Sequence, residues 1–144
     1  MTVIAWDGKT LAADKQTTSG GTTGTVTKIH RVPGGIVGFT GNEGHAVALL
    51  AWFLDGRNPD KWPKKSGNDC ASAVFITADG MFCYTGEDGP FASKHEDKRD
   101  AWGAGYAYAL AAMHLGHNAR EAVQVACALD INCGMGIDTL ELEQ

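Results

Sequence analysis

Thr2 carries two groups that together can form a complete catalytic unit. Once an aminopeptidase removes Met1, the Thr2 hydroxyl and a free α-amine belong to the same residue. The amine has a pKa of about 7.7 to 8.0 in model peptides, so it can take up the hydroxyl proton near neutral pH. Many chains begin Met-Thr without any such role, so Thr2 indicates nucleophilic catalysis only in combination with other residues.

Histidine and cysteine, the other residue types suited to chemistry, show no metal-binding pattern. His114 and His117 are three positions apart, but Gly116 ends the predicted helix between them, so we expect surface histidines, no metal site and no cofactor. The cysteines lack a C-x-x-C spacing, and we expect them to be reduced packing residues; they are Cys70, Cys83, Cys127 and Cys133.

Length and composition favour one globular domain spanning residues 1–144. At 144 residues the chain can bury enough surface to fold without disulfides. A net charge of -5 gives no basic surface for nucleic acid or anionic lipid. The apolar stretches, such as residues 46–54, are shorter than the roughly 20 residues of a membrane span, and no leader precedes them. We therefore predict a cytoplasmic protein without nucleic-acid or membrane partners.

Three antiparallel strand pairs are predicted in the first part of the chain. Asp-Gly turns separate residues 2–6 from 10–13 and residues 73–77 from 81–85, which is typical of β-hairpins. Residues 26–32 and 36–40 flank Pro-Gly-Gly, a third turn sequence.

Helical periodicity begins at residue 43. Apolar residues spaced three and four apart predict a helix that ends near Gly56, and residues 57–69 form an exposed loop. A second helix begins near Tyr106 and ends at Gly116; a third starts at a capping box of Asn118 and Glu121 and ends near residue 129. Residues 136–142 form a closing strand. The order of elements predicts an α+β fold, a layered sandwich with four layers if two sheets stack inside.

Four segments resemble the proteasome β-subunit family, which includes the bacterial peptidase HslV. They are Thr2-Val-Ile-Ala, Leu11-Ala-Ala-Asp14, Lys28-Ile-His-Arg and Val37-Gly-Phe-Thr-Gly41. The similarity continues through residues 101–109, 119–123 and 128–134 and covers nearly the whole chain. It implies an N-terminal nucleophile (Ntn) hydrolase of compact bacterial or phage type. The implied fold is an αββα sandwich of two antiparallel sheets with a shortened outer helical layer, because relatives carry a second helix where residues 57–69 lie.

The resemblance assigns a role to each matching residue. Thr2 is the nucleophile, Lys28 is the cation that favours the neutral amine of Thr2, and Asp14 keeps Lys28 charged. Gly41 supplies an oxyanion N–H, and Asp130 orients the amine. The matching substrate-binding positions are Thr18, Val26, His30, Phe39 and Glu43.

Two departures from the family remove hydroxyl groups. Relatives have serine where this chain has Ala104, and a second serine where it has Cys133. Alanine cannot hydrogen-bond through its side chain, and a thiol is a weak donor, so proton transfer around Thr2 is impaired or runs through water.

We therefore expect a threonine-type endopeptidase that cleaves peptides or unfolded protein within a homo-oligomeric ring, with an ATP-dependent unfoldase as an open question. Two alternatives remain: a proteasome-like scaffold that has lost its chemistry, and an Ntn amidase acting on a small amide.

Overall fold

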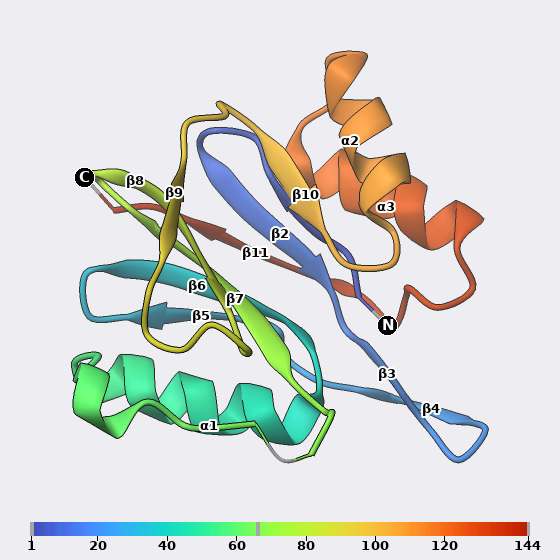
Figure 1. The fold of residues 1–144 in the computed structure, drawn as a ribbon. Helices are drawn as coiled ribbons and strands as arrows, with labels where there is room; N and C mark the ends of the chain where they lie inside the picture. Colours follow the sequence, from blue (N-terminus) through green and yellow to red (C-terminus); the bar gives the residue numbers. More distant parts are fainter. Residues whose placement is uncertain (1, 66, 144) are drawn as a thin grey trace. The chain divides into compact units, whose positions relative to one another are not determined.

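The computed structural model describes residues 2–65 and 67–143, which form two compact units. Unit 1 comprises residues 2–29 and 97–141, and unit 2 comprises residues 30–96 (except 66) and 142–143. Figure 1 shows the elements of both units in chain order. That residues 1–144 form one domain stays a prediction.

Unit 1 contains a four-stranded antiparallel sheet in the order β10-β1-β2-β11. The strands are β1 (Ile4–Trp6), β2 (Thr10–Asp14), β10 (Asp100–Trp102) and β11 (Ile137–Glu141). A separate hairpin is formed by β3 (Gln16–Ser19) and β4 (Thr22–Thr25) (Figure 1). The predicted first hairpin and closing strand are confirmed.

Two helices, α2 (Tyr106–His114) and α3 (Ala119–Leu129), pack on the unit 1 sheet. Their contact surfaces are alanine-rich, which lets the helix backbones approach the sheet closely. The buried alanines are Ala109, Ala112, Ala119, Ala122 and Ala126, and they meet Val3, Ala5 and Ala12 of the sheet in one apolar core. Ala109 and Ala112 of α2 therefore belong to the core of unit 1.

The start of α3 is fixed by three side-chain acceptors. Asn118 and Glu121 form the predicted capping box, with hydrogen bonds of 2.9 and 3.1 Å. Asp7, in the β1–β2 turn, accepts the Ala119 N–H at 2.8 Å. The same carboxylate accepts the Lys9 and Thr10 N–H groups, so one residue joins the hairpin turn to the helix.

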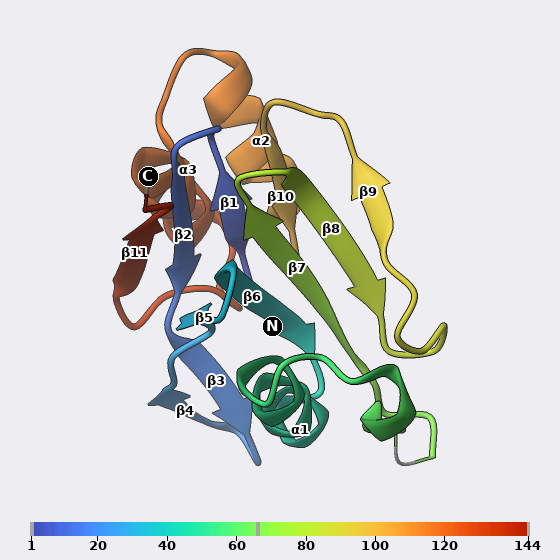
Figure 2. The ribbon, with the colours of Figure 1, turned by 90° about the vertical axis from the view of Figure 1, so that its left-hand side faces the viewer.

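Unit 2 contains a five-stranded antiparallel sheet in the order β5-β6-β7-β8-β9. The strands are β5 (Ile29–Val32), β6 (Gly35–Gly41), β7 (Ala71–Thr77), β8 (Gly80–Thr85) and β9 (Ser93–His95). Helix α1 (Glu43–Leu54) packs against β6 and β7 (Figure 2). A core of aromatic side chains fills this contact, with Phe53 and Trp52 meeting Tyr84 edge to face.

The structure corrects several sequence predictions. The loop 57–69 contains a short 3₁₀ helix, η1 (Pro59–Lys61). It buries more apolar surface than expected, because Trp62 stacks on Tyr84 and packs against Trp52. β5 begins at Ile29 rather than at residue 26, since the Val26 N–H donates to the Lys15 carbonyl instead. The β3–β4 hairpin and the strands β9 and β10 were not predicted.

No helix in the described part of the chain is long and apolar enough to cross a membrane.

Candidate active site

Asp14, at the end of β2, is fully buried and accepts four hydrogen bonds. Its Oδ1 accepts the Val3 N–H at 3.1 Å and the Lys28 ammonium at 2.8 Å. Its Oδ2 accepts the N–H groups of Gln16 and Gly134 at 3.3 and 3.1 Å. Three backbone donors and one cation compensate for the loss of water around the carboxylate.

Lys28 is almost as buried as its partner, with a side-chain exposure of 8%. A buried ammonium needs a nearby negative charge to offset its lost hydration, and Asp14 supplies it. Oδ1 of Asp14 is shared between Lys28 and the Val3 N–H, so the cation and the backbone next to Thr2 meet at one oxygen atom. The predicted pairing of Asp14 with Lys28 is present, and it is not a solvated surface pair.

Thr2 is buried, with 8% exposure, and its backbone is held by the segment that leads into α2. The Gly105 N–H donates to the Thr2 carbonyl at 3.2 Å. Gly103 has φ 93°, and a Cβ on it would lie 2.2 Å from the same carbonyl oxygen. Only glycine fits there, so this turn fixes Thr2 through backbone contact rather than through a serine hydroxyl. Ala104, between the two glycines, is exposed.

A loop that follows α3 closes over Asp14. The Gly134 N–H donates to Asp14 and the Gly134 carbonyl accepts the Lys15 N–H at 3.0 Å. The buried Gln16 side chain donates to the Ile131 carbonyl at 3.1 Å. Asp130, at the end of α3, accepts the Asn132 N–H at 2.8 Å. Its predicted role in orienting the Thr2 amine stays a prediction.

Two cysteines whose thiols are influenced by the Asp14 charge stay protonated. Burial raises the pKa of Cys133 to about 12, and the negative charges of Asp14 and Asp130 add to the effect. Burial also raises the pKa of Cys127 to about 11, with a further contribution from Asp14. The described cysteines are free thiols, as predicted. Since the thiolate is the reactive form, Cys133 is a neutral packing group and not a competing nucleophile.

The predicted oxyanion residue, Gly41, belongs to unit 2. It ends β6 with φ 94° and directly precedes Asn42, the N-cap of α1. A Cβ on Gly41 would lie 2.5 Å from the Cys70 carbonyl oxygen, so glycine is required by close packing as well as by conformation. The expected position at the head of the first helix is confirmed, whereas its action on a substrate belongs to the proposal below.

The predicted substrate-binding residues are divided between the units. Thr18 is exposed on β3, and Val26 follows β4 in unit 1. In unit 2, Phe39 is buried with its ring 6.1 Å from that of His30, and Glu43 is the exposed first residue of α1. Their role in binding stays a prediction.

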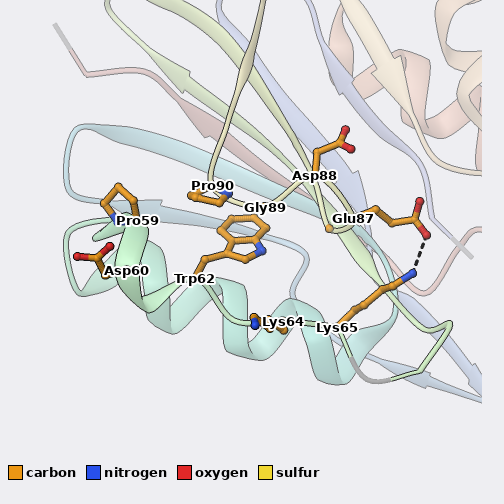
Figure 3. Close-up of a pocket in the computed structure, with 10 residues that line it drawn as sticks. Pro59, Asp60, Trp62, Lys64, Lys65, Glu87, Asp88, Gly89 and Pro90 are labelled. Atoms are coloured by element: carbon orange, nitrogen blue, oxygen red, sulfur yellow. Dashed lines mark hydrogen bonds and ion pairs between the residues drawn. The ribbon is translucent and has the colours of Figure 1, made fainter.

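An open pocket in unit 2 has a volume of about 510 Å³ and lies between η1 and the turn after β8 (Figure 3). Trp62 forms part of its wall, Pro59 and Pro90 flank it, and Lys65 pairs with Glu87 at its rim at 2.7 Å. Hydrogen bonding to Glu87 raises the pKa of Lys65. Sequence analysis assigned no role to these residues.

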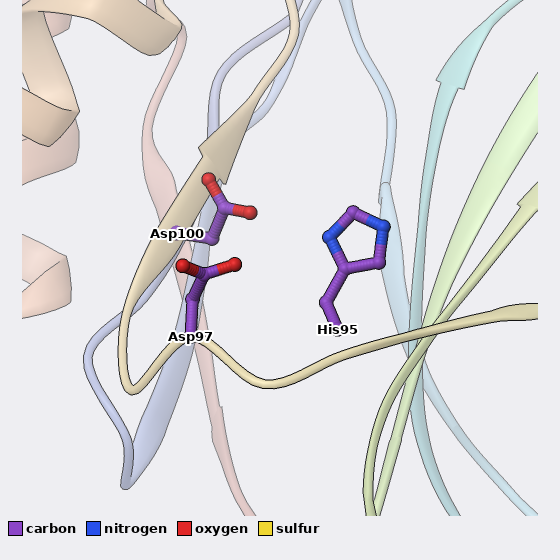
Figure 4. Close-up of side chains that lie close together, drawn as sticks. All are labelled: His95, Asp97 and Asp100. Atoms are coloured by element: carbon purple, nitrogen blue, oxygen red, sulfur yellow. The ribbon is translucent and has the colours of Figure 1, made fainter.

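Asp97 and Asp100 lie on the segment that enters β10 in unit 1, whereas His95 ends β9 in unit 2 (Figure 4). The two carboxylates that unit 1 provides here do not by themselves make a metal site.

Three residues of the site were not predicted from the sequence: Gln16 and Gly134, which donate to Asp14, and Gly105, which donates to the Thr2 carbonyl. Their backbone and amide donors carry no catalytic signature. The glycines of Gly103-Ala-Gly105 were the available signal, since closely spaced glycines often mark a close backbone approach.

Comparison with solved structures identifies proteins of the same fold. BPH of Thiobacillus denitrificans in complex with epoxomicin aligns over 100% of both chains with 21% identity and a TM-score of 0.70. The same protein in a second structure gives 19% identity, 99% and 97% coverage and a TM-score of 0.71. Eukaryotic HslV from Trypanosoma brucei gives 20% identity, 99% coverage of both chains and a TM-score of 0.71.

No protein-family model and no curated protein matches the sequence. The α+β fold inferred from the HslV resemblance is confirmed.

Proposed function

We propose that this protein is a threonine peptidase of the proteasome and HslV type, with Thr2 as its nucleophile after removal of Met1. The observation that carries the proposal is the single Asp14 oxygen shared by the buried Lys28 ammonium and the Val3 N–H. Met1 itself lies outside the described residues. Solved structures of the same fold, one of them with epoxomicin bound, add support.

The chemistry follows from the groups around the new N-terminus. The Thr2 Oγ1 attacks the peptide carbonyl carbon while the α-amine takes the hydroxyl proton. Lys28, held charged by Asp14, opposes protonation of that amine and stabilises the emerging negative charge. The tetrahedral intermediate collapses to an ester on Thr2, and the leaving amine departs with the proton. Water then attacks the ester and restores Thr2.

Gly41 is the proposed donor to the oxyanion, through its main-chain N–H. Loss of one such donor in other enzymes lowers kcat by about 10² to 10³. In the same proposal Asp130 orients the amine, and an extended substrate contacts the predicted binding positions: Thr18, Val26, His30, Phe39 and Glu43.

Intact mass spectrometry with epoxomicin tests the nucleophile. The wild-type chain should lack Met1 and gain the mass of one inhibitor, Thr2→Ala should gain none, and Thr23→Ala, on the exposed strand β4, should label like wild type. Labelling that persists in Thr2→Ala removes Thr2 from the mechanism. Turnover of fluorogenic peptides against small amides then separates a peptidase from an amidase.

A scaffold without activity is the second candidate, because two hydroxyls of the family's network are replaced. Ala104 has no polar side chain, and Cys133 carries a thiol whose pKa of about 12 keeps it neutral. A chain that retains Met1 and does not label favours this alternative. Ala104→Ser with Cys133→Ser restores both hydroxyls, and a gain of labelling in that variant would assign the defect to them.

The assembly is proposed to be a homo-oligomeric ring that encloses the sites, with peptide or unfolded protein as substrate. Mass photometry that detects monomer at all concentrations tested would contradict it. An ATP-dependent unfoldase partner would reveal itself by ATP-dependent degradation of a folded substrate.

A further inference from the structure

His45, on the first turn of α1, is buried with 6% exposure and uses both ring nitrogens. The Ala71 N–H donates to its Nδ1 at 2.8 Å, and its Nε2 lies 2.9 Å from the Pro63 carbonyl oxygen. The imidazole joins the start of a helix, the start of β7 and the loop that precedes β7.

The partners determine the protonation state of the ring. A backbone N–H can only donate, so Nδ1 must be the unprotonated acceptor. A carbonyl oxygen can only accept, so Nε2 must carry the hydrogen. Both bonds are satisfied together only by neutral imidazole, because a proton on Nδ1 would face the Ala71 N–H.

The contacts of His45 continue to Gly41. Ala71 is the register partner of Gly41 across β6 and β7, and the Asn42 N–H donates to the Cys70 carbonyl at 2.9 Å. Cys70 and Ala71 are the residues against which Gly41 is packed so closely that a Cβ would collide with them. The Asn42 side chain in turn accepts the His45 N–H at 2.8 Å. Ala71 and Asn42 are thus bonded to His45, and Cys70 is adjacent to Ala71.

Gly86 lies next to the His45 ring, where a larger residue would not fit. A Cβ on Gly86 would lie 2.9 Å from His45 Cε1 and 2.4 Å from the Ala71 carbonyl oxygen. A side chain at residue 86 would therefore collide with both the imidazole and the backbone that it binds.

We propose that His45 is a positioning residue that holds the Gly41 backbone in place through Ala71, and does so only while its imidazole is neutral. The consequence for catalysis rests on the proposed function, in which Gly41 provides the oxyanion N–H. Protonation of the His45 ring should release the Ala71 backbone, because Nδ1 would then be a donor that faces the donor N–H of Ala71.

Other ionisable groups lie on the segments around the ring and contribute to any pH profile. They are Glu43 on α1, Lys64 and Lys65 after Pro63, Asp69 and Cys70 before β7, and Glu87 and Asp88 after Gly86. A variant without the imidazole separates their effect from that of His45.

The direct test is hydrogen exchange and histidine ¹⁵N NMR of the intact chain. Wild-type His45 should show the Nε2–H tautomer, with high protection factors for the Ala71 and Asn42 amides, whose acceptors are His45 Nδ1 and the Cys70 carbonyl. These protection factors should fall when acid brings the histidine ¹⁵N shifts to those of a doubly protonated ring. His45→Leu should lower these protection factors about tenfold or more whatever the pH, because an unpaired buried donor is costly. His45→Asn keeps an acceptor for Ala71 and should restore protection while abolishing the acid sensitivity. His114→Asn, exposed at the end of α2, should match wild type.

Peptide hydrolysis supplies the second readout. His45→Leu should lower kcat about tenfold or more with KM within about twofold, and His45→Asn should recover most of the loss. Unchanged protection of the Ala71 and Asn42 amides in His45→Leu would overturn the proposal, and so would protection that is lost while kcat stays at the wild-type value. If wild type neither cleaves peptide nor labels at Thr2, the proposed function fails, while the exchange data still decide whether His45 holds Gly41.

Discussion

Replacing Asp14 with asparagine should destabilise the protein far more than its small change in shape suggests. Asparagine keeps one oxygen and places an NH₂ group where the other was. If the NH₂ replaces Oδ1, the Val3 N–H and the Lys28 ammonium lose their acceptor; if it replaces Oδ2, the Gln16 and Gly134 N–H groups do. No orientation of the amide satisfies all four donors.

The magnitude follows from burial. Each buried donor without a partner costs about 1–3 kcal/mol, and breaking a buried ion pair by removing one charge costs about 3–5 kcal/mol. These terms overlap because Lys28 contributes to both, so we expect Asp14→Asn to lower the free energy of unfolding by about 3–5 kcal/mol. That is a large fraction of the roughly 5–15 kcal/mol available to a typical domain.

Guanidinium unfolding measures this loss, with Asp138→Asn as the matched control. Asp138 also pairs with a lysine at 2.7 Å, but its side chain is 34% exposed and that of Lys15 is 22% exposed. Such a pair contributes about 0–1 kcal/mol. If Asp14→Asn and Asp138→Asn have the same midpoint, the buried network does not stabilise the fold and the electrostatic reasoning about Lys28 is refuted.

Three further predictions concern positions around this network. Gly103→Ala should lower the free energy of unfolding by about 3 kcal/mol or more and abolish epoxomicin labelling, because its Cβ would collide with the Thr2 carbonyl at a positive φ. Ala104→Ser, at the exposed neighbour, should lower it by less than about 0.5 kcal/mol in the same guanidinium assay. The raised pKa of Cys133 favours the thiol in the folded state, so its stabilisation is complete below about pH 8.5 and is lost as pH rises toward about 12. Urea midpoints above about pH 9 should therefore fall less steeply in Cys133→Ala than in wild type, and parallel slopes would contradict this. Asp7→Ala should lower the free energy of unfolding by about 1–3 kcal/mol, because the Ala119 N–H loses its cap and two turn amides lose their acceptor; a thermal midpoint equal to that of wild type would show that water replaces them.

Elements with local signals were predictable from the sequence. The Asp7-Gly8 and Asp79-Gly80 turns lie between apolar strands, and the capping box at Asn118 marks a helix start by its own hydrogen bonds. The β3–β4 hairpin was missed because its strands are rich in threonine and show no apolar alternation, although Gly20-Gly21 with positive φ at both residues is a typical hairpin turn. β9 and β10 have three residues each and are strands only through pairing with neighbours distant in sequence.

Some residues of the candidate site were likewise predictable from the sequence, and others were not. Thr2, Asp14 and Lys28 could be named because the resemblance supplied their positions, and the Asp14–Lys28 bond is present at 2.8 Å. The Gly134 donor lies 120 residues from Asp14, and no local pattern connects them. His45 had no role predicted from the sequence, because composition alone cannot show that its ring bonds to Ala71 and Pro63.

The Asp14 carboxylate makes folding and the charge near Thr2 interdependent. Its donors come from three segments, namely Val3 before β1, residues 16–28, and the loop after α3, so the carboxylate is fully compensated only when all three are assembled. Lys28 contributes a charge but not a backbone position, and without it Asp14 still accepts three N–H groups. Lys28→Met should therefore destabilise the fold less than Asp14→Asn does, yet remove the cation proposed to keep the Thr2 amine neutral. A Lys28→Met protein that stays folded and still labels at the wild-type rate would show that the carboxylate network serves the structure alone.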